Sequence, residues 1–253
     1  IGALRVASLE RDIDDGFSGI SREYDDLWLL TDGYRDWMLK KTLGHLKMHT
    51  NCKFADLGAG TGMFAHLLKQ GAPLESDAIC VDPSEAMLMN AVQYGGLQTY
   101  CESAEAFVKR RVQLDRILIK ESIHHIRNRR SFWRKIRSSL MPNGRVLMVT
   151  RPSLPEFPLF KRGMAAFSES QPELDILLEE ISASGLNAVT NTEAYYVEMP
   201  KERWYAMLRA RFMSSLAGFT PGEIEQGILE VDGQLGGDQI RFTDRLFFVV
   251  VEQ

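Results

Sequence analysis

A glycine-rich turn, placed between a short apolar run and a helical pattern, constrains the fold of this chain more than any other feature. It lies in the segment Phe54-Ala55-Asp56-Leu57-Gly58-Ala59-Gly60-Thr61-Gly62-Met63-Phe64. Because glycine has no side chain, the backbone of such a turn can approach a ligand closely, and the N–H groups that open the next helix face that ligand. The segment therefore predicts a strand, a ligand-binding turn and a helix.

The spacing of the glycines distinguishes between ligand classes. A dinucleotide fingerprint requires a glycine at position 63, where this chain has Met63. A phosphate-binding P-loop requires Gly-Lys-Ser/Thr, but the first lysine after Gly62 is Lys69. The turn therefore disfavours a nicotinamide-dependent dehydrogenase and excludes a P-loop.

Short apolar runs alternate with helical stretches over residues 51–150. The runs are Phe54 to Leu57, Ala78 to Val81, Leu97 to Cys101, Ile117 to Ile119 and Val146 to Val149. Helices are expected at Met63 to Gln70, Glu85 to Gln93 and Ser131 to Leu140, each followed by glycine or by proline and glycine. Strands that are apolar on both faces need helices on both sides, so we predict an α/β fold with an open, doubly wound parallel sheet.

The segments on either side of this core differ from it in pattern. Residues 1–50 look helical, and residues 151–170 are expected to form a loop because they contain three prolines. A helix is expected from Pro172 to about Gly185. Strands are expected at Ala188 to Met199 and Phe242 to Val251, separated by an insertion with a helical stretch from Lys201 to Leu216.

We therefore expect one structural domain in three parts. Residues 1–50 would form a helical cap segment and residues 51–150 the cofactor-binding core. Residues 151–253 would complete the sheet and add substrate-cap insertions at about 151–170 and 200–235.

Composition narrows the classes of partner. The chain has 253 residues, 45 % of them hydrophobic, and a net charge of −4, so it is not disordered and has no overall attraction for nucleic acid or an anionic membrane. No apolar stretch approaches the roughly 20 residues that cross a bilayer. The three cysteines form no C-x-x-C pair, which favours a reducing, cytoplasmic compartment. No metal site is expected.

Two carboxylates follow neighbouring strands. Asp56 ends the first apolar run and Asp82 follows the second, so both are expected at the carboxyl edge of the sheet, where open α/β sheets bind ligands. One can accept hydrogen bonds from vicinal ribose hydroxyls, and the other suits a cationic amino-acid group. Together they indicate a nucleoside that carries an amino acid.

Five motifs in this order resemble those of the class I S-adenosylmethionine-dependent methyltransferases, over about residues 50–150. They are Asp56 to Gly62, the acid Asp82, Glu102-Ser103-Ala104-Glu105, Asp115 to Ile126, and Pro142-Asn143-Gly144-Arg145-Val146-Leu147-Met148. The resemblance implies a Rossmann-like sheet of seven mostly parallel strands with helical cap insertions. It also implies S-adenosyl-L-methionine as cofactor and S-adenosyl-L-homocysteine as product.

The resemblance also assigns cofactor-binding positions. They are Asp56, Gly58, Ala59, Gly60, Thr61, Gly62, Asp82, Pro83, Ser84, Met87, Ser103, Ala104, Glu105, Lys120, Glu121 and Ser122. The family commonly has aspartate where Ser103 stands, so the bond to the adenine amino group falls to the Ser103 hydroxyl or to the backbone near Ala104. Tyr24 would cover the cofactor carboxylate or face the substrate.

The expected reaction is in-line transfer of a methyl group to a nitrogen or oxygen nucleophile of a small organic molecule. Of the adjacent His124 and His125, at most one is expected to face the site. His125 resembles a histidine of phosphoethanolamine methyltransferases and is the candidate base; Tyr24 and Glu121 are the other candidate catalytic residues. Arg151, Trp204 and Arg211 are candidate substrate-binding residues.

Two other functions remain open at this stage. One is a protein or RNA methyltransferase, although the net charge and the absence of an Asn-Pro-Pro-Tyr-like tetrad disfavour RNA. The other is an inactive methyltransferase-like subunit that binds S-adenosylmethionine, which the intact glycines and Asp82 disfavour. A monomer or a homodimer is expected.

Overall fold

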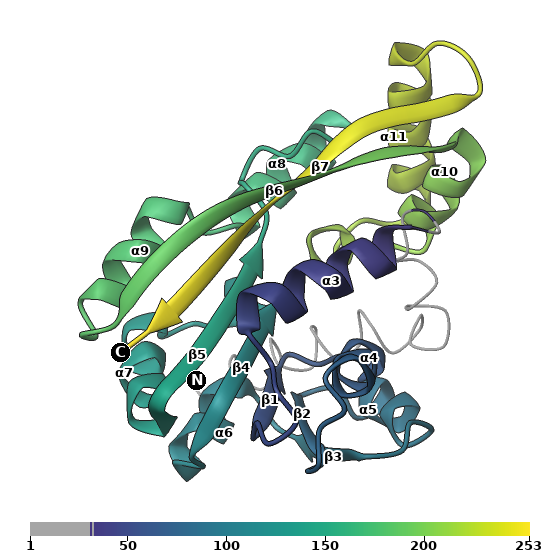
Figure 1. Cartoon of the computed structure of the whole chain (residues 1–253). Coiled ribbons are helices and arrows are strands. Elements are labelled where there is room, and N and C mark those ends of the chain that lie inside the picture. Colours follow the sequence, from purple (N-terminus) through teal and green to yellow (C-terminus); the bar gives the residue numbers. More distant parts are fainter. Residues whose placement is uncertain (1–30, 32) are drawn as a thin grey trace, which may run out of the picture.

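The computed structural model describes residues 31 and 33–253 and contains a seven-stranded sheet of order β3-β2-β1-β4-β5-β7-β6 (Figure 1). The strands are β1 (Phe54–Leu57), β2 (Ala78–Asp82), β3 (Leu97–Cys101), β4 (Leu114–Lys120), β5 (Leu140–Thr150), β6 (Asn187–Pro200) and β7 (Gln239–Glu252). The first five pair in parallel, and β7 is antiparallel to β5 and β6. The order reverses between β1 and β4, which is where such sheets bind ligands. The predicted fold class is confirmed.

Helices cover both faces of this sheet. On one face lie α3 (Tyr34–Leu46), α4 (Met63–Gly71) and α5 (Glu85–Ala91); on the other lie α6 (Ala104–Phe107), α7 (Arg129–Ser139) and α9 (Leu174–Ser182). Within β4, Leu118 packs with the first set, whereas Ile117 and Ile119 pack with the second. This alternation is the period of two that a strand imposes, and it explains why the core strands are apolar at successive positions.

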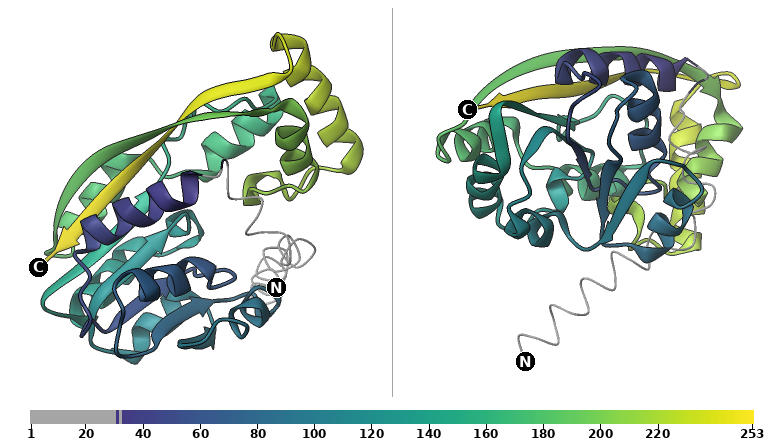
Figure 2. Two further views of the ribbon diagram at one scale, coloured as in Figure 1. Left: turned by 45° about the vertical axis from the view of Figure 1, so that its right-hand side comes forward. Right: turned by 60° about the horizontal axis from the view of Figure 1, so that its bottom comes forward.

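Strands β6 and β7 extend beyond the rest of the sheet (Figures 1 and 2). They pair with each other over their whole length, from Asn187 opposite Glu252 to Pro200 opposite Gln239, but β7 pairs with β5 only as far as Phe247. The extension carries α10 (Lys201–Arg209) and α11 (Pro221–Gln234), and the short 3₁₀ helix η3 (Ser214–Leu216) lies between those helices in the sequence.

One expectation for the segment after β5 is wrong. Residues 151–170 were expected to be a loop, but α8 occupies Lys161–Ser170. All the prolines precede Phe160, the residue before the helix, so they restrict the connection and leave the following backbone N–H groups able to form a helix. Helix α8 packs against η3 and α11.

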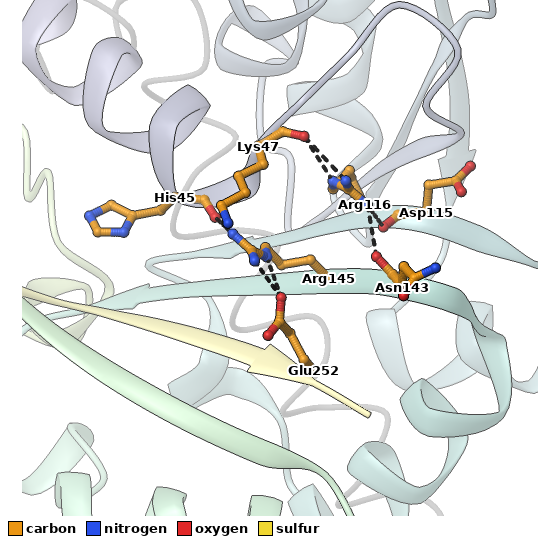
Figure 3. A network of polar contacts seen from close by, with 7 residues as sticks. All are labelled: His45, Lys47, Asp115, Arg116, Asn143, Arg145 and Glu252. Carbon is orange, nitrogen blue, oxygen red and sulfur yellow. Dashed lines mark hydrogen bonds and ion pairs between the residues drawn. The ribbon is translucent and has the colours of Figure 1, made fainter.

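Helix α3 is attached to the sheet through the carbonyl groups at its C-terminal end (Figure 3). Arg145 Nη1 donates to the His45 carbonyl oxygen at 2.7 Å and also pairs with Glu252. Arg116 donates from Nε and Nη2 to the Lys47 carbonyl oxygen at 3.3 and 3.2 Å. Cationic groups are favourable at a helix C-terminus, where the partial charge is negative. These bonds fix α3 across β4, β5 and β7. None of the helices in residues 33–253 is long and apolar enough to cross a membrane.

Candidate active site

The glycine turn after β1 is held against β2 and against the loop after β4. The N–H groups of Gly58 and Ala59 both donate to the Val81 carbonyl oxygen, at 2.8 and 3.0 Å. Gly58 has a φ of +88°, and a Cβ there would lie 2.4 Å from the Ser122 Cβ. Ser122 Oγ donates to the Leu57 carbonyl oxygen at 2.7 Å. Glycine at 58 is therefore required both for the conformation and for the contact between the turn and the end of β4.

The third glycine is required for a similar reason. Gly62 has a φ of +74° and precedes the first residue of α4. A Cβ at this position would lie 2.8 Å from the Ala91 Cβ of α5. The packing of α4 against α5 next to the turn therefore requires a glycine at this position.

Asp82, at the end of β2, is oriented by two backbone groups. Its Oδ2 accepts from the Gly60 N–H at 2.9 Å, and its Oδ1 accepts from the Ser84 N–H at 2.9 Å. Ser84 in turn caps α5, because its Oγ accepts from the Met87 N–H at 3.3 Å. The carboxylate is therefore held beside the glycine turn at the carboxyl edge of the sheet.

Asp56 is a buried carboxyl group at the end of β1. The residue is 2 % exposed, and its Oδ1 has no hydrogen-bond partner within the structure. Burial, opposed by the charge of Lys120 and supported by that of Asp82, raises the pKa of Asp56 to about 7 from its ordinary 3.8. Lys120 also lies over the Phe64 ring, 5.1 Å from its centroid.

At the end of β3, the residues predicted to contact adenine begin α6. Ser103 caps this helix, with Oγ accepting from the Ala106 N–H at 3.2 Å. Glu105 Oε1 accepts from the Asn128 N–H at 3.0 Å, which connects this edge to the start of α7. The Ser103 hydroxyl thus caps α6 in this structure, and its contact with adenine stays a prediction.

A cavity opens next to this edge, between the ends of β4 and β5 and the helices of the extension. Its lining residues are Glu121, His124, His125, Arg151, Phe157, Phe167, Gln171, Trp204, Phe212, Met213, Ser214, Ser215 and Phe242. The space that protein atoms leave there, with the open mouth included, is about 550 Å³. Much of the lining is aromatic, and its polar part consists of residues after β4 and β5 together with Gln171, Ser214 and Ser215.

Both histidines of the 3₁₀ helix η2 (Ile123–His125) line this cavity, although at most one was expected to face the site. Their rings lie 4.1 Å apart. His124 Nε2 is 3.4 Å from Ser214 Oγ, and its Nδ1 has no partner within the structure. Burial, with the charge of His125, lowers the pKa of His124 to about 3, and burial also lowers the pKa of His125. Both rings are therefore neutral at neutral pH and able to accept a proton.

Arg151, expected to bind substrate, takes part in a buried ionic network. It donates from Nε and Nη2 to the two carboxylate oxygens of Asp244, both at 2.9 Å, and Nη1 pairs with Glu121. Tyr34 of α3 donates to Asp244 Oδ2 at 2.6 Å. Burial, with the charge of Asp244, raises the pKa of Tyr34, so the hydroxyl stays protonated. Arg151 lines the cavity but is held by carboxylates of the protein.

The structure brings most of the predicted site residues to one edge of the sheet and separates Arg211 from it. At the carboxyl ends of β1, β2, β3 and β4 lie the turn residues 58–62, residues 82–84, residues 103–105 and residues 120–122. Trp204 lines the cavity and donates to the Pro158 carbonyl oxygen at 2.9 Å. Arg211 instead donates to the Phe219 carbonyl oxygen and is absent from the lining. Tyr24 lies outside the described residues.

The sequence analysis missed Asp244, for which a signal was available. Ile240, Phe242, Leu246 and Phe248 alternate on the buried side of β7, and the period of two places Asp244 on that same side. An acid in an apolar alternation needs a buried partner, which here is Arg151. Ser214 and Ser215 of η3 carried no comparable signal.

Comparison with known proteins agrees with this geometry. A family model described as a methyltransferase domain matches residues 55–146. The YcgJ protein from Bacillus subtilis is 17 % identical over 85 % of this chain and 97 % of its own, with a TM-score of 0.62. A putative methyltransferase from an antibiotic biosynthesis pathway of Anabaena variabilis is 16 % identical over 85 % and 96 %, with a TM-score of 0.61. No curated protein matches.

A further solved structure is an S-adenosylmethionine-dependent methyltransferase from Thiobacillus denitrificans in complex with S-adenosyl-L-homocysteine. It is 14 % identical over 85 % of this chain and 90 % of its own, with a TM-score of 0.53. The fold is that of the class I S-adenosylmethionine-dependent methyltransferases, and residues 55–146 match a methyltransferase domain, which supports an enzyme that uses this cofactor.

Proposed function

We propose that this protein transfers a methyl group from S-adenosylmethionine to a nitrogen or oxygen nucleophile of a small organic molecule. The observation that carries the proposal is the position of the cavity. Glu121 lines it, while the next residue, Ser122, packs against Gly58 of the glycine turn. A methyl donor seated on the turn and an acceptor in the cavity would therefore meet at the end of β4.

The residues at the edge of the sheet fit this cofactor. Asp56 has a buried carboxylate oxygen without a protein partner, which suits the cationic amino-acid end. Asp82 would accept the ribose hydroxyls, and the backbone of the turn lies where the amino-acid moiety would pass. Ser103, Ala104 and Glu105 would flank the adenine.

When bound, S-adenosylmethionine supplies a methyl group already activated on a sulfonium. The protein then has to align the nucleophile with that methyl and exclude water. The buried aromatic side chains of Phe157, Trp204, Phe212 and Phe242 would exclude water from the acceptor. The substrate cap would be formed by α10, which carries Trp204, and by α8 and η3, which follow Phe157 and Phe212.

A nitrogen or oxygen acceptor must also lose a proton. We propose His125 as the group that accepts it, because its ring lines the cavity and the direction of its pKa shift keeps it neutral. His124 is less suited, since burial has lowered its pKa to about 3 and it lies near Ser214 Oγ.

The test is transfer of label from methyl-labelled S-adenosylmethionine to a cell extract separated by size. The proposal expects label in the small-molecule fraction. Label only in protein or RNA would refute the small-molecule acceptor while leaving methyl transfer intact. Absence of both binding and transfer would refute the enzyme assignment.

A further inference from the structure

Three residues that line the cavity carry a polar atom that the protein does not satisfy. Glu121 Oε1, His124 Nδ1 and Ser215 Oγ are all buried, and none has a hydrogen-bond partner within the structure. All three residues line the same cavity. A buried polar atom without a partner costs about 1–3 kcal/mol; because the Glu121 side chain is partly exposed and lines the cavity, a rotation of its carboxylate would let a ligand complete these bonds.

The charged groups at this cavity do not balance one another among the described residues. Arg151 contributes one positive charge, and it faces two carboxylates, Asp244 and Glu121. Asp244 receives two hydrogen bonds from the guanidinium and one from Tyr34. Glu121 contacts Arg151 through Oε2 only, which leaves Oε1 directed elsewhere. Counted over the described residues, this network therefore has two carboxylates for one guanidinium group.

The other lining groups do not restore this balance. Among the described residues that line the cavity, Arg151 is the only lysine or arginine, and its partners are protein carboxylates. Gln171 and the two serines are neutral, and burial lowers the pKa of both histidines. An anionic acceptor would meet no uncommitted cation here, whereas a cation would neutralise the excess charge.

The backbone at Glu121 indicates that its position is enforced. This residue has a φ of +54°, in the left-handed region that is unfavourable for residues other than glycine. Its N–H donates to the Val149 carbonyl oxygen at 2.9 Å, which continues the pairing of β4 with β5 by one residue. The conformation directs the side chain toward Arg151 and the cavity rather than along the strand.

From these observations we infer that the methyl acceptor is an amine with an aromatic or apolar body, bound as an ammonium ion by the Glu121 carboxylate. The rings of Phe157, Trp204, Phe212 and Phe242 would surround its apolar part. The ammonium would pass one proton to a neutral imidazole of the cavity. Its nitrogen lone pair would then form the N–C bond as the S–C bond breaks, with that electron pair remaining on sulfur.

This inference rests on the proposed function, but its test is a binding measurement that needs no cofactor. The probes are 2-phenylethylamine, 2-phenylethanol and 3-phenylpropionate, which share a phenyl ring and present a cation, a neutral group and an anion. Calorimetric titration, with quenching of tryptophan fluorescence as a second signal, would measure the affinity of each for the whole chain. The amine is expected to bind at least 10-fold more tightly than the alcohol, and the carboxylate most weakly.

The matched variants are Glu121→Gln and Glu169→Gln. The first keeps the size of the side chain and removes the charge in the cavity; the second removes the same charge from an exposed position on α8. Loss of a charge-assisted hydrogen bond corresponds to an affinity that is roughly 10- to 100-fold lower. We expect that loss for the amine in Glu121→Gln, with less than a twofold change for the alcohol and no change in Glu169→Gln.

Two results would overturn the inference. One is equal affinity for amine and alcohol in the unmodified protein, or binding by none of the probes, a result that stands even if Glu121→Gln does not fold. The other is a folded Glu121→Gln protein that keeps the amine preference. A separate titration with S-adenosylmethionine distinguishes failure of the proposed function, because cofactor binding and amine preference can fail independently.

Discussion

Asp56 makes the stability of the protein depend on pH in a way that can be calculated. Its pKa is about 7 in the folded state against 3.8 ordinarily, and the first cause is burial. A carboxyl group whose pKa is raised by folding favours the folded state while it is protonated. That contribution is present at low pH and is lost as the pH rises through the folded pKa.

The size of this effect follows from the pH range over which the folded and the unfolded protein bind different numbers of protons. Each pKa unit corresponds to about 1.36 kcal/mol. Between pH 5 and pH 7 the unfolded carboxyl is ionised and the folded one is largely protonated, so ionisation should cost the folded protein roughly 2–3 kcal/mol over this range. Above about pH 7 both states are ionised and the cost stops growing.

The perturbation is Asp56→Asn, which keeps the shape and removes the titration. Urea denaturation of both proteins without cofactor at pH 5, 7 and 8 measures the difference in unfolding free energy. We expect the unfolding free energy of Asp56→Asn, relative to that of the unmodified protein, to rise by roughly 2–3 kcal/mol from pH 5 to pH 8. The control Asp175→Asn, at an exposed position of α9, should show no such change.

A difference between Asp56→Asn and the unmodified protein that does not vary with pH would refute this reasoning. It would mean that Asp56 is ionised throughout, with Lys120 compensating for burial. The sign is also diagnostic, because a difference that shrinks as the pH rises is the opposite of what a raised pKa produces.

The remaining predictions concern the base and the buried network. His125→Ala should lower turnover by about 10² to 10⁴ with little change in cofactor affinity, measured by steady-state kinetics and calorimetry. The acid limb of the pH–rate profile should lie below pH 6.5, since the pKa of His125 is lowered, and should disappear in the variant; turnover within threefold would refute the role. Asp244→Asn should lower the unfolding free energy by about 3–5 kcal/mol, because it leaves the buried Arg151 without its main partner. The exposed Asp238→Asn is its control, and equal urea midpoints for the two would contradict the network.

Local sequence patterns were sufficient to predict the core of this protein. The turn from Gly58 to Gly62 and the apolar runs of β1 to β5 depend on neighbouring residues, and the structure has each of these elements, although β5 already begins at Leu140 and not at the expected Val146. The parallel order follows because strands that are apolar on both faces require helices on both sides.

The cavity could not be predicted in the same way. Tyr34 and Asp244 are 210 positions apart in the chain, and no local pattern pairs them. Helix α8 was hidden by the prolines before it. Helix α11 was not predicted either, although Thr220, Pro221 and Glu223 form a capping box with proline at the first turn. The contacts between these helices decide which aromatic side chains face the cavity, and such contacts depend on the whole fold.

The central claim is tested most directly by calorimetric titration of S-adenosylmethionine into the unmodified protein and into Asp82→Ala. The account predicts one site in the unmodified protein. It also predicts an affinity lower by about 2–4 kcal/mol, or roughly 30- to 1000-fold, in the variant, because a charge-assisted contact with the ribose is lost. Equal affinity in the two proteins, with the variant folded, would contradict the assignment of this edge of the sheet as the cofactor site.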